Sequence, residues 1–179
     1  MPVKPLNMYK ILYLFLLLPF TNFAQSASDR KLLPSRDGKI FYEMVDSPLS
    51  KKKSEIFASA KTWFAEKFND SKTILQIDDQ EGGELLGKAT FSTRISDGSA
   101  SPLNSVQFTI KVSCRDRKYR IQIYDLGSRH SSEYDFEPMD WMNKPGSTAG
   151  QVFLANVDKE ILSIMLAAKD HIEKQSDNF

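Results

Sequence analysis

The sequence predicts an α+β domain in which two helices cover one face of a single antiparallel sheet of about five strands. Apolar residues recur every three or four positions in two segments and at every second position in several others. These segments follow the order β-α-β-β-β-β-α. Consecutive strands flanked by helices are typical of α+β domains, in which the second face of the sheet stays in contact with water.

The first predicted strand, Lys39 to Asp46, has apolar residues on both of its faces. A helix is predicted from Pro48 to about Asn69, with Ser47 as its N-cap, because Ser favours the cap position and Pro the first turn. Apolar residues recur along this helix at spacings of three and four, which predicts one buried face. They are Ile56, Phe57, Ala60, Trp63, Phe64 and Phe68.

Four further strands are predicted because apolar and polar residues alternate along short segments. These segments cover residues 73–79, 84–96, 105–114 and 118–125. Gly82 and Gly83 fall in the turn between the first two, where a hairpin requires positive φ angles. Alternation places Cys114 on the inward face of its strand, where a thiol behaves as a small buried apolar group.

A second helix is predicted over residues 157–175, with Asn156 as its cap. The preceding residues, 127–150, show no usable periodicity, and long irregular segments in small domains are often functional. Two interpretations remain open for the apolar residues of this segment: a short helix that closes one end of the core, or a lid over a ligand. These residues are Phe136, Met139, Trp141 and Met142.

The first 24 residues have the pattern of a secretory signal peptide, because Lys4 and Lys10 precede a ten-residue apolar run at positions 11–20. That run is half the length needed to cross a bilayer, so no stable membrane span is expected after cleavage. Cys114 is the only cysteine, so no thiol near the cleavage site can carry a lipid. The predicted location is the periplasm or the cell exterior.

Residues 25–38 are polar and contain Pro34 and Gly38, which predicts a flexible leader before a single domain at residues 39–179. Without residues 1–24 the chain keeps 22 basic and 23 acidic side chains. A nucleic-acid-binding protein needs clustered positive charge to neutralise phosphates, so no nucleic-acid partner is expected.

Several motifs resemble a family of secreted bacterial domains of unknown function, family 4468, described as having a TBP-like fold. The resemblance covers about Ile40 to Asp125 and implies the same element order, with no reaction or ligand. The motifs that carry it are Trp63-Phe64-Ala65-Glu66-Lys67-Phe68, Ile77-Asp78-Asp79, Gly83-Glu84-Leu85-Leu86-Gly87-Lys88, Val106-Gln107-Phe108-Thr109-Ile110-Lys111-Val112 and Lys118-Tyr119-Arg120. Fold alone does not transfer function, so the TBP-like description does not indicate DNA binding.

Four basic side chains and one tyrosine fall on the water-facing side of the predicted strands and form the candidate ligand-binding set. They are Lys88, Arg94, Lys111, Arg120 and Tyr124. No acidic residue is expected on the outward positions of these strands, so the face suits an anionic polymer, a sugar chain or a segment of an envelope protein. The alternative is an ordinary solvated sheet face, which Lys and Arg stems cover well.

No sequence signature of catalysis is present, so the protein is predicted not to be an enzyme, and no cofactor or metal is expected. His130 and the acidic residues after it fit neither a calcium loop nor a zinc motif. Lys51, Lys52 and Lys53 are expected to be a solvated run at a helix start, with anion recruitment as the alternative. The predicted function is non-catalytic binding through the polar sheet face; a carrier with an apolar pocket between helix and sheet is the alternative, and an envelope hydrolase is less favoured.

Overall fold

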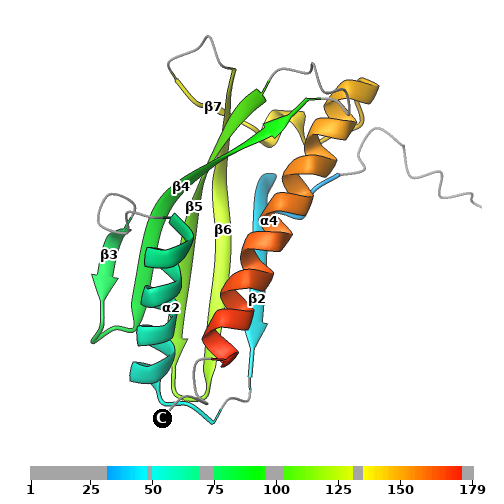
Figure 1. Ribbon diagram of the computed structural model, residues 1–179. Helices are drawn as coiled ribbons and strands as arrows, with labels where there is room; N and C mark the ends of the chain where they lie inside the picture. Colours follow the sequence, from blue (N-terminus) through cyan, green and yellow to red (C-terminus); the bar gives the residue numbers. More distant parts are fainter. Residues whose placement is uncertain (1–31, 48–49, 69–74, 96–102, 131–134, 175–179) are drawn as a thin grey trace, which may run out of the picture.

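The computed structural model describes residues 32–47, 50–68, 75–95, 103–130 and 135–174 (Figure 1). Seven strands form one antiparallel sheet, with the order β1-β2-β6-β5-β4-β3 and with β7 paired to β6. The strands are β1 (Ser35–Arg36), β2 (Lys39–Asp46), β3 (Leu75–Asp79), β4 (Glu84–Arg94), β5 (Leu103–Arg115), β6 (Lys118–His130) and β7 (Glu137–Pro138). The predicted α+β class and the order of its main elements are confirmed, and the two additional strands have two residues each.

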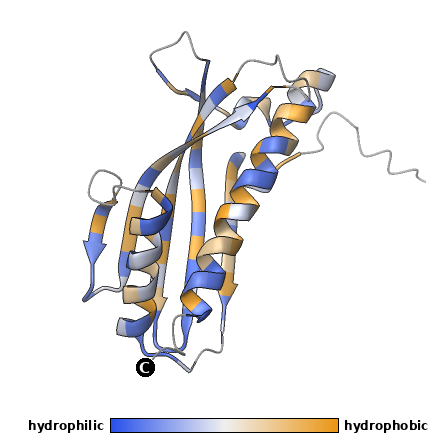
Figure 2. Ribbon diagram, viewed as in Figure 1, coloured by the Kyte–Doolittle hydropathy of each residue, from blue (hydrophilic) through white to orange (hydrophobic). Residues whose placement is uncertain are grey.

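Helices α2 (Lys53–Phe68) and α4 (Thr148–Lys174) lie on the same face of the sheet, as Figure 1 shows. Their apolar sides and the inward side chains of the strands form one core. Orange and blue segments alternate along β6 in Figure 2, which is the period of two expected for a strand with one covered face. The face opposite the helices is therefore the one that the sequence predicts to be polar.

Helix α2 begins five residues later than predicted, at Lys53, so Ser47 is not its N-cap. The carboxylate of Glu55 accepts a hydrogen bond from the backbone N–H of Lys52 (2.6 Å), and Asp116 accepts one from that of Lys53 (2.9 Å). Asp116 lies in the turn between β5 and β6, so the sheet supplies a cap that local sequence cannot reveal. Pro48 lies outside the described residues.

The prediction of a solvated lysine run is wrong for Lys51, because its side chain is buried. Its Nζ donates a hydrogen bond to the backbone carbonyl of Ile172, in the last turn of α4. Cations stabilise helix C-termini, where carbonyl groups lack partners within the helix. The Lys53 side chain also binds a backbone carbonyl, that of Glu81 (2.6 Å). Both lysines therefore connect elements of the fold.

Helix α4 begins nine residues earlier than predicted. Ser147 is its N-cap, since its hydroxyl accepts a hydrogen bond from the backbone N–H of Gly150 (3.2 Å). Phe153 and Leu154 extend the buried face of the helix by one turn. Asn156, the predicted cap, lies within the helix, where its side-chain amide donates to the carbonyl of Arg94 (3.2 Å).

The predicted flexible leader is wrong for residues 32–38. Asp37 and Gly38 have positive φ angles of 52° and 79° and join β1 to β2 as a two-residue hairpin turn. Leu33 is a core residue, and its backbone N–H and carbonyl both bind the side chain of Asn143 (2.7 and 3.0 Å). The domain therefore includes residues before Lys39.

A β-bulge in β6 explains why the sequence pattern stops at Asp125. The register shifts between Gln107 and Thr109 of β5, and Asp125 has a positive φ of 52°. The bulge exposes Asp125, and Leu126 takes the inward position instead. The strand then continues to His130, five residues beyond the predicted end.

Gly83 and Gly38 both have positive φ angles, but only at Gly83 would a Cβ collide with another atom. Comparing the stabilities of their alanine variants therefore distinguishes steric collision from backbone strain. Gly83 has a φ of 72°, and a Cβ there would lie 2.5 Å from the carbonyl oxygen of Cys114. We expect Gly83→Ala to lower the free energy of unfolding by more than about 2 kcal/mol. Gly38→Ala is the matched control, because its φ is 79° and no atom lies within 4 Å. It should lose about 1 kcal/mol in urea unfolding; equal losses would contradict the steric argument.

The predicted signal peptide, residues 1–24, lies outside the described residues, as do residues 25–31 of the predicted leader. Within the described part of the chain, no helix combines the length and apolar composition that a membrane crossing requires.

Candidate binding site

The strand register places three rows of side chains across the uncovered face of the sheet. Tyr124 lies opposite Phe41 of β2 and Thr109 of β5, and Lys88 of β4 lies opposite Thr109. The next row is Leu86, Lys111, Gln122 and Glu43. The third row is Glu84, Ser113, Arg120 and Val45. Residues that are far apart in the chain thus form one surface.

Three cavities follow one another along β6 on this face, and we call them together the groove. The central cavity has a volume of about 580 Å³. It shares Lys111 and Gln122 with a basic cavity of about 280 Å³ towards the turn between β5 and β6. It shares Lys39, Asp125 and Asp140 with a distal cavity of about 210 Å³ towards β7.

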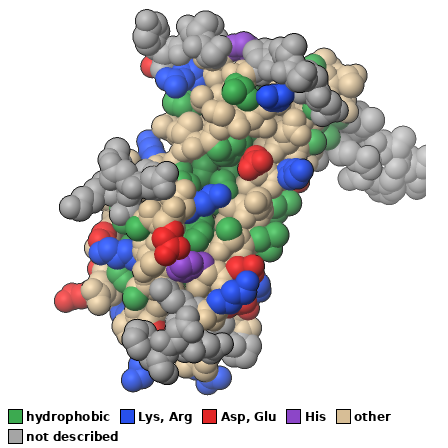
Figure 3. Space-filling view, viewed as in Figure 1, with side chains coloured by type: hydrophobic (Ala, Val, Ile, Leu, Met, Phe, Trp, Pro, Cys, Tyr) green, Lys and Arg blue, Asp and Glu red, His purple; other side chains and the backbone are tan. Residues whose placement is uncertain are grey.

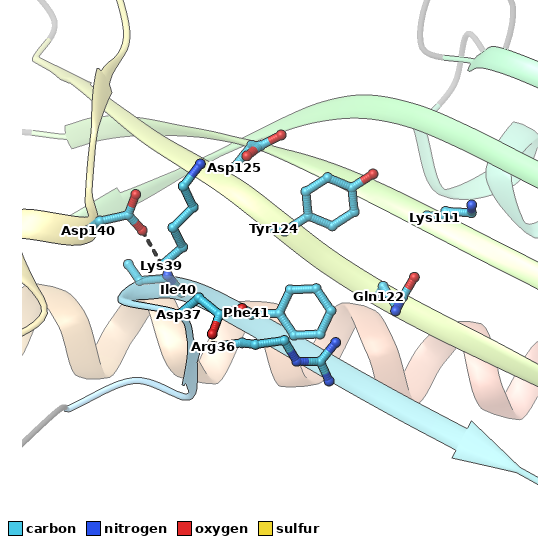
Figure 4. Close-up of a pocket in the computed structure, with 10 residues that line it drawn as sticks. All are labelled: Arg36, Asp37, Lys39, Ile40, Phe41, Lys111, Gln122, Tyr124, Asp125 and Asp140. Carbon is cyan, nitrogen blue, oxygen red and sulfur yellow. Dashed lines mark hydrogen bonds between the residues drawn. The ribbon is translucent and has the colours of Figure 1, made fainter.

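The central cavity has an aromatic wall. Phe41 and Tyr124 are half-buried, and their rings stack with centroids 6.2 Å apart at an angle of 20°. The guanidinium group of Arg36 lies 4.0 Å from the centre of the Phe41 ring. Figure 4 shows the hydroxyl group of Tyr124 on the side of Lys111. Burial raises the pKa of Tyr124, so its hydroxyl remains a hydrogen-bond donor at neutral pH.

The basic cavity contains more positive than negative side chains. Its bases are Lys111, Arg115, Lys118 and Arg120, and its one acid is Glu84. The central cavity is balanced, with three bases and three acids, and the distal cavity has one base and two acids. Charge along the groove therefore changes from positive near Lys118 to slightly negative near β7.

The expectation that no acid accompanies the outward bases is wrong. Glu84 lies on the same face of β4 and forms an ion pair with Lys111 (2.8 Å). Glu43, from β2, lies 3.0 Å from Arg36 and 3.6 Å from Arg120. A hydrogen bond from Gln122 lowers the pKa of Glu43, and the two arginines lower it further. The strand of Glu43, β2, is far from β6 in the sequence and pairs with it only in the folded sheet. The strand order therefore places Glu43 beside Arg120.

The structure divides the predicted site residues into two groups. Lys111, Arg120 and Tyr124 line the groove. Lys88 is exposed on the same face, and neither it nor Arg94 lines one of the three cavities. Arg94 is six residues beyond Lys88 on β4, a separation of about 20 Å along a strand.

Sequence reasoning missed several groove residues. Phe41 was visible as an apolar residue on the second face of the first strand, a face expected to be wet. Arg36 and Asp37 belong to the hairpin, for which the Asp37-Gly38 pair is a recognised signal. Asp125 reaches the groove only because of the bulge, and no local pattern indicates this.

The 127–150 segment closes one end of the core, as one of its two interpretations predicts, and it also reaches the groove. Met139 is fully buried, and its N–H binds the carbonyl of Leu126 (2.9 Å), so it closes one end of the core. The adjacent 3₁₀ helix η3 (Asp140–Met142) is the predicted short helix. Trp141 instead has 65% of its surface exposed. Asp140 lines the groove, and its carboxylate accepts a hydrogen bond from the N–H of Ile40 (2.7 Å).

Cys114 and His130 could form a nucleophile and its base only if they lay close together, and they do not. Cys114 is buried as predicted, and burial raises the pKa of its thiol to about 12. It pairs with Tyr119 of β6, and His130 lies eleven residues further along that strand, about 36 Å away. Among the described residues, no three His, Cys, Asp or Glu side chains lie close enough to hold a metal ion.

Aromatic rings occupy the space between α2 and the sheet. Phe64 contacts Trp63 and Phe68, and Phe108 of β5 contacts Phe68 and Phe91, with centroids 5.2–6.5 Å apart. No residue of α2 or α4 lines any of the three cavities. Figure 3 shows acidic and basic side chains intermixed on the helix side of the molecule. The uncovered sheet face is therefore the better candidate for binding.

A helix-covered antiparallel sheet with this element order belongs to the class of TBP-like α+β domains. In a comparison with family models, residues 41–128 match the family described as "Domain of unknown function (DUF4468) with TBP-like fold". The resemblance predicted from sequence motifs is thus confirmed. No curated protein sequence matches the chain.

Two crystal structures are similar to this fold. One is a TBP-like protein from Parabacteroides distasonis, with a TM-score of 0.62 and 14% identity over 79% of this chain and 99% of that one. The other is a DUF4468 family protein from Bacteroides ovatus, with a TM-score of 0.57 and 14% identity over 77% of this chain and 85% of that one. At this identity the likeness concerns the fold.

Proposed function

We propose that this protein is a secreted or periplasmic, non-catalytic binding domain that holds its ligand in the groove on the uncovered sheet face. The observation that carries the proposal is the continuity of the three cavities, which share Lys111 and Gln122 on one side and Asp125 on the other. Concave sites with a few convergent polar groups around apolar rings are typical of ligand binding. An envelope protein or an anionic polymer would meet such groups here.

A non-catalytic role is supported by the side chains that line the groove. The thiol of Cys114 is a poor nucleophile, because the residue is 1% exposed and its raised pKa disfavours the thiolate. Tyr124 and Gln122 offer neutral donors, and Glu84 is held in an ion pair. Such groups orient a ligand without an activated nucleophile or a poised general base.

Secretion is proposed from the sequence of residues 1–24. N-terminal sequencing of the chain recovered from the periplasm or the medium should find cleavage within a few residues of Ala24. A chain that keeps Met1 in the cell would contradict this part of the proposal.

Native mass spectrometry of the mature chain, purified from its own cell envelope, tests binding without assuming a ligand. We expect a reproducible additional mass on the wild-type chain that is absent from a Lys111→Ser/Tyr124→Ala variant. Lys111 forms a surface ion pair, so its loss should cost less than about 1 kcal/mol of stability. The control is Lys159→Ser/Leu166→Ala, which removes a base and an exposed apolar side chain from α4.

The proposal requires that the groove variant loses the mass and that the control keeps it. A wild-type chain without added mass, or equal retention by both variants, would overturn binding in the groove. Circular dichroism of each variant shows whether the fold persists.

A further inference from the structure

The basic cavity differs from the rest of the groove in that two of its basic side chains form no ion pair with another described residue. Arg115 and Lys118 are exposed at the ends of β5 and β6 and form no ion pair with another described residue. Lys111 and Arg120 are each near one carboxylate, of Glu84 and Glu43 respectively. Two cations thus face this cavity with their donors available to a ligand. Arg and Lys donors bind carboxylate and phosphate oxygens strongly.

The carboxylates in the rest of the groove would repel a polymer that carries a negative charge on every unit. Asp37, Asp125 and Asp140 line the central cavity, and the last two also line the distal cavity. A nucleic acid strand carries a phosphate at each residue and would place several of them near these carboxylates. The groove therefore matches a chain molecule whose negative charge is confined to one part.

The groove also lacks the main-chain partners that an extended peptide uses. Peptides commonly bind sheets by adding a strand to an exposed edge. The central cavity also reaches the β1–β2 hairpin. The groove otherwise lies over β5 and β6, and both strands are paired on their two sides. Their backbone donors and acceptors are occupied by the neighbouring strands, so a ligand must use side chains.

Side chains of the central and distal cavities suit a sugar ring. The amides of Gln122 and Gln107 can donate to hydroxyl groups and accept from them, and the carboxylate of Asp125 can accept from them. Tyr124 offers aromatic surface, whose electron-rich face attracts the weakly positive C–H groups of a pyranose ring, and Phe41 stacks with Tyr124. From Lys118 to Gly127, β6 runs along the groove for about 30 Å, which accommodates several sugars in a row.

We propose that the groove binds an acidic oligosaccharide in an extended conformation, with an anionic group in the basic cavity and neutral rings along the central and distal cavities. This inference rests on the proposed function and names its ligand class. Arg115 and Lys118 hold the anionic group, Lys111 joins the two cavities, and Tyr124 stacks with a ring.

The test uses an array of oligosaccharides of five to seven sugars that carry uronate or phosphate groups, each beside its neutral counterpart. We expect the wild-type mature chain to bind at least one acidic member ten times more tightly than its neutral counterpart. Arg115→Ser/Lys118→Ser should remove this preference and leave the affinity for the neutral counterpart within twofold. Tyr124→Ala should weaken both by at least tenfold. Arg94→Ser, on the same face outside the cavities, should change neither.

Two further probes distinguish other macromolecules: a hexaglutamate peptide and a 12-nucleotide single-stranded RNA. Binding of either as tightly as the best oligosaccharide, with dependence on Arg115 and Lys118, overturns the assignment to sugars. Absence of binding to every acidic oligosaccharide also overturns it. If the envelope-purified chain still carries a mass that depends on Lys111 and Tyr124, the proposed function survives that failure. If it carries none, both fall. Unchanged melting temperatures of the variants exclude unfolding as the cause.

Discussion

Replacement of Phe64 by alanine is expected to lower the free energy of unfolding by about 3–5 kcal/mol, the range for loss of a buried aromatic ring. Phe64 has no exposed surface and lies on the face of α2 that packs on the sheet. Its ring contacts Trp63 at 5.2 Å and Phe68 at 5.9 Å between centroids. The variant would leave a cavity that these rings cannot close without leaving their own contacts.

Urea unfolding followed by circular dichroism measures this loss. Trp141→Ala is the control, because the indole is 65% exposed and its removal should change stability by less than about 0.5 kcal/mol. Similar losses for both variants would mean that the cluster beneath α2 does not stabilise the domain. A small loss for Phe64→Ala together with new ligand uptake would instead support the carrier alternative.

Alkaline pH is expected to destabilise the domain through two buried tyrosines. Burial, more than any other cause, raises the pKa values of Tyr42 and Tyr119 well above 10. Each hydroxyl also donates to a carboxylate of α4: that of Asp158 from Tyr42 (2.8 Å) and that of Glu173 from Tyr119 (3.1 Å). These contacts connect the covered face of the sheet to the helix.

Proton linkage predicts that the free energy of unfolding falls at alkaline pH. A raised pKa in the folded chain leaves stability unchanged below the unfolded value near 10 and lowers it as pH rises from there towards the folded value. By pH 11 each tyrosine should remove about 1.4 kcal/mol, or about 3 kcal/mol for the pair. Urea unfolding between pH 8 and pH 11 measures this.

Tyr42→Phe/Tyr119→Phe is the comparison variant. It should begin less stable at pH 8, because it loses two hydrogen bonds to charged groups, and should then lose about 3 kcal/mol less than wild type by pH 11. Parallel pH profiles for the two proteins would show that these hydroxyls do not titrate on unfolding.

The position of the groove explains why the candidate site was only partly predictable. Lys111, Arg120 and Tyr124 follow directly from strand alternation, because a period of two assigns each residue to a face. Phe41 and Glu43 come from β2, which pairs with β6 and not with β4, and Arg36 comes from β1, which pairs with β2. Their contribution depends on strand order, which local periodicity does not contain.

Helix boundaries show the same limit. The apolar spacing of Trp63, Phe64 and Phe68 predicts a helix and its buried face. Where α2 begins depends on Asp116, which is 63 residues from the backbone N–H that it binds. Lys51, which precedes α2, donates a hydrogen bond to the carbonyl of Ile172 at the end of α4. Unpaired backbone groups at helix ends accept partners from anywhere in the fold, so tertiary contacts decide the first and last turns.

The sequence by itself determined the α+β class, the order of the main elements, the inward position of Cys114 and the outward position of the basic residues. These features follow from hydrophobic periodicity, which each segment carries alone. Only the tertiary structure decided which outward residues meet in the groove, which acids accompany them and that Arg94 lies apart. Those relations depend on strand order and on the bulge at Asp125, where the backbone changes the face of every residue that follows.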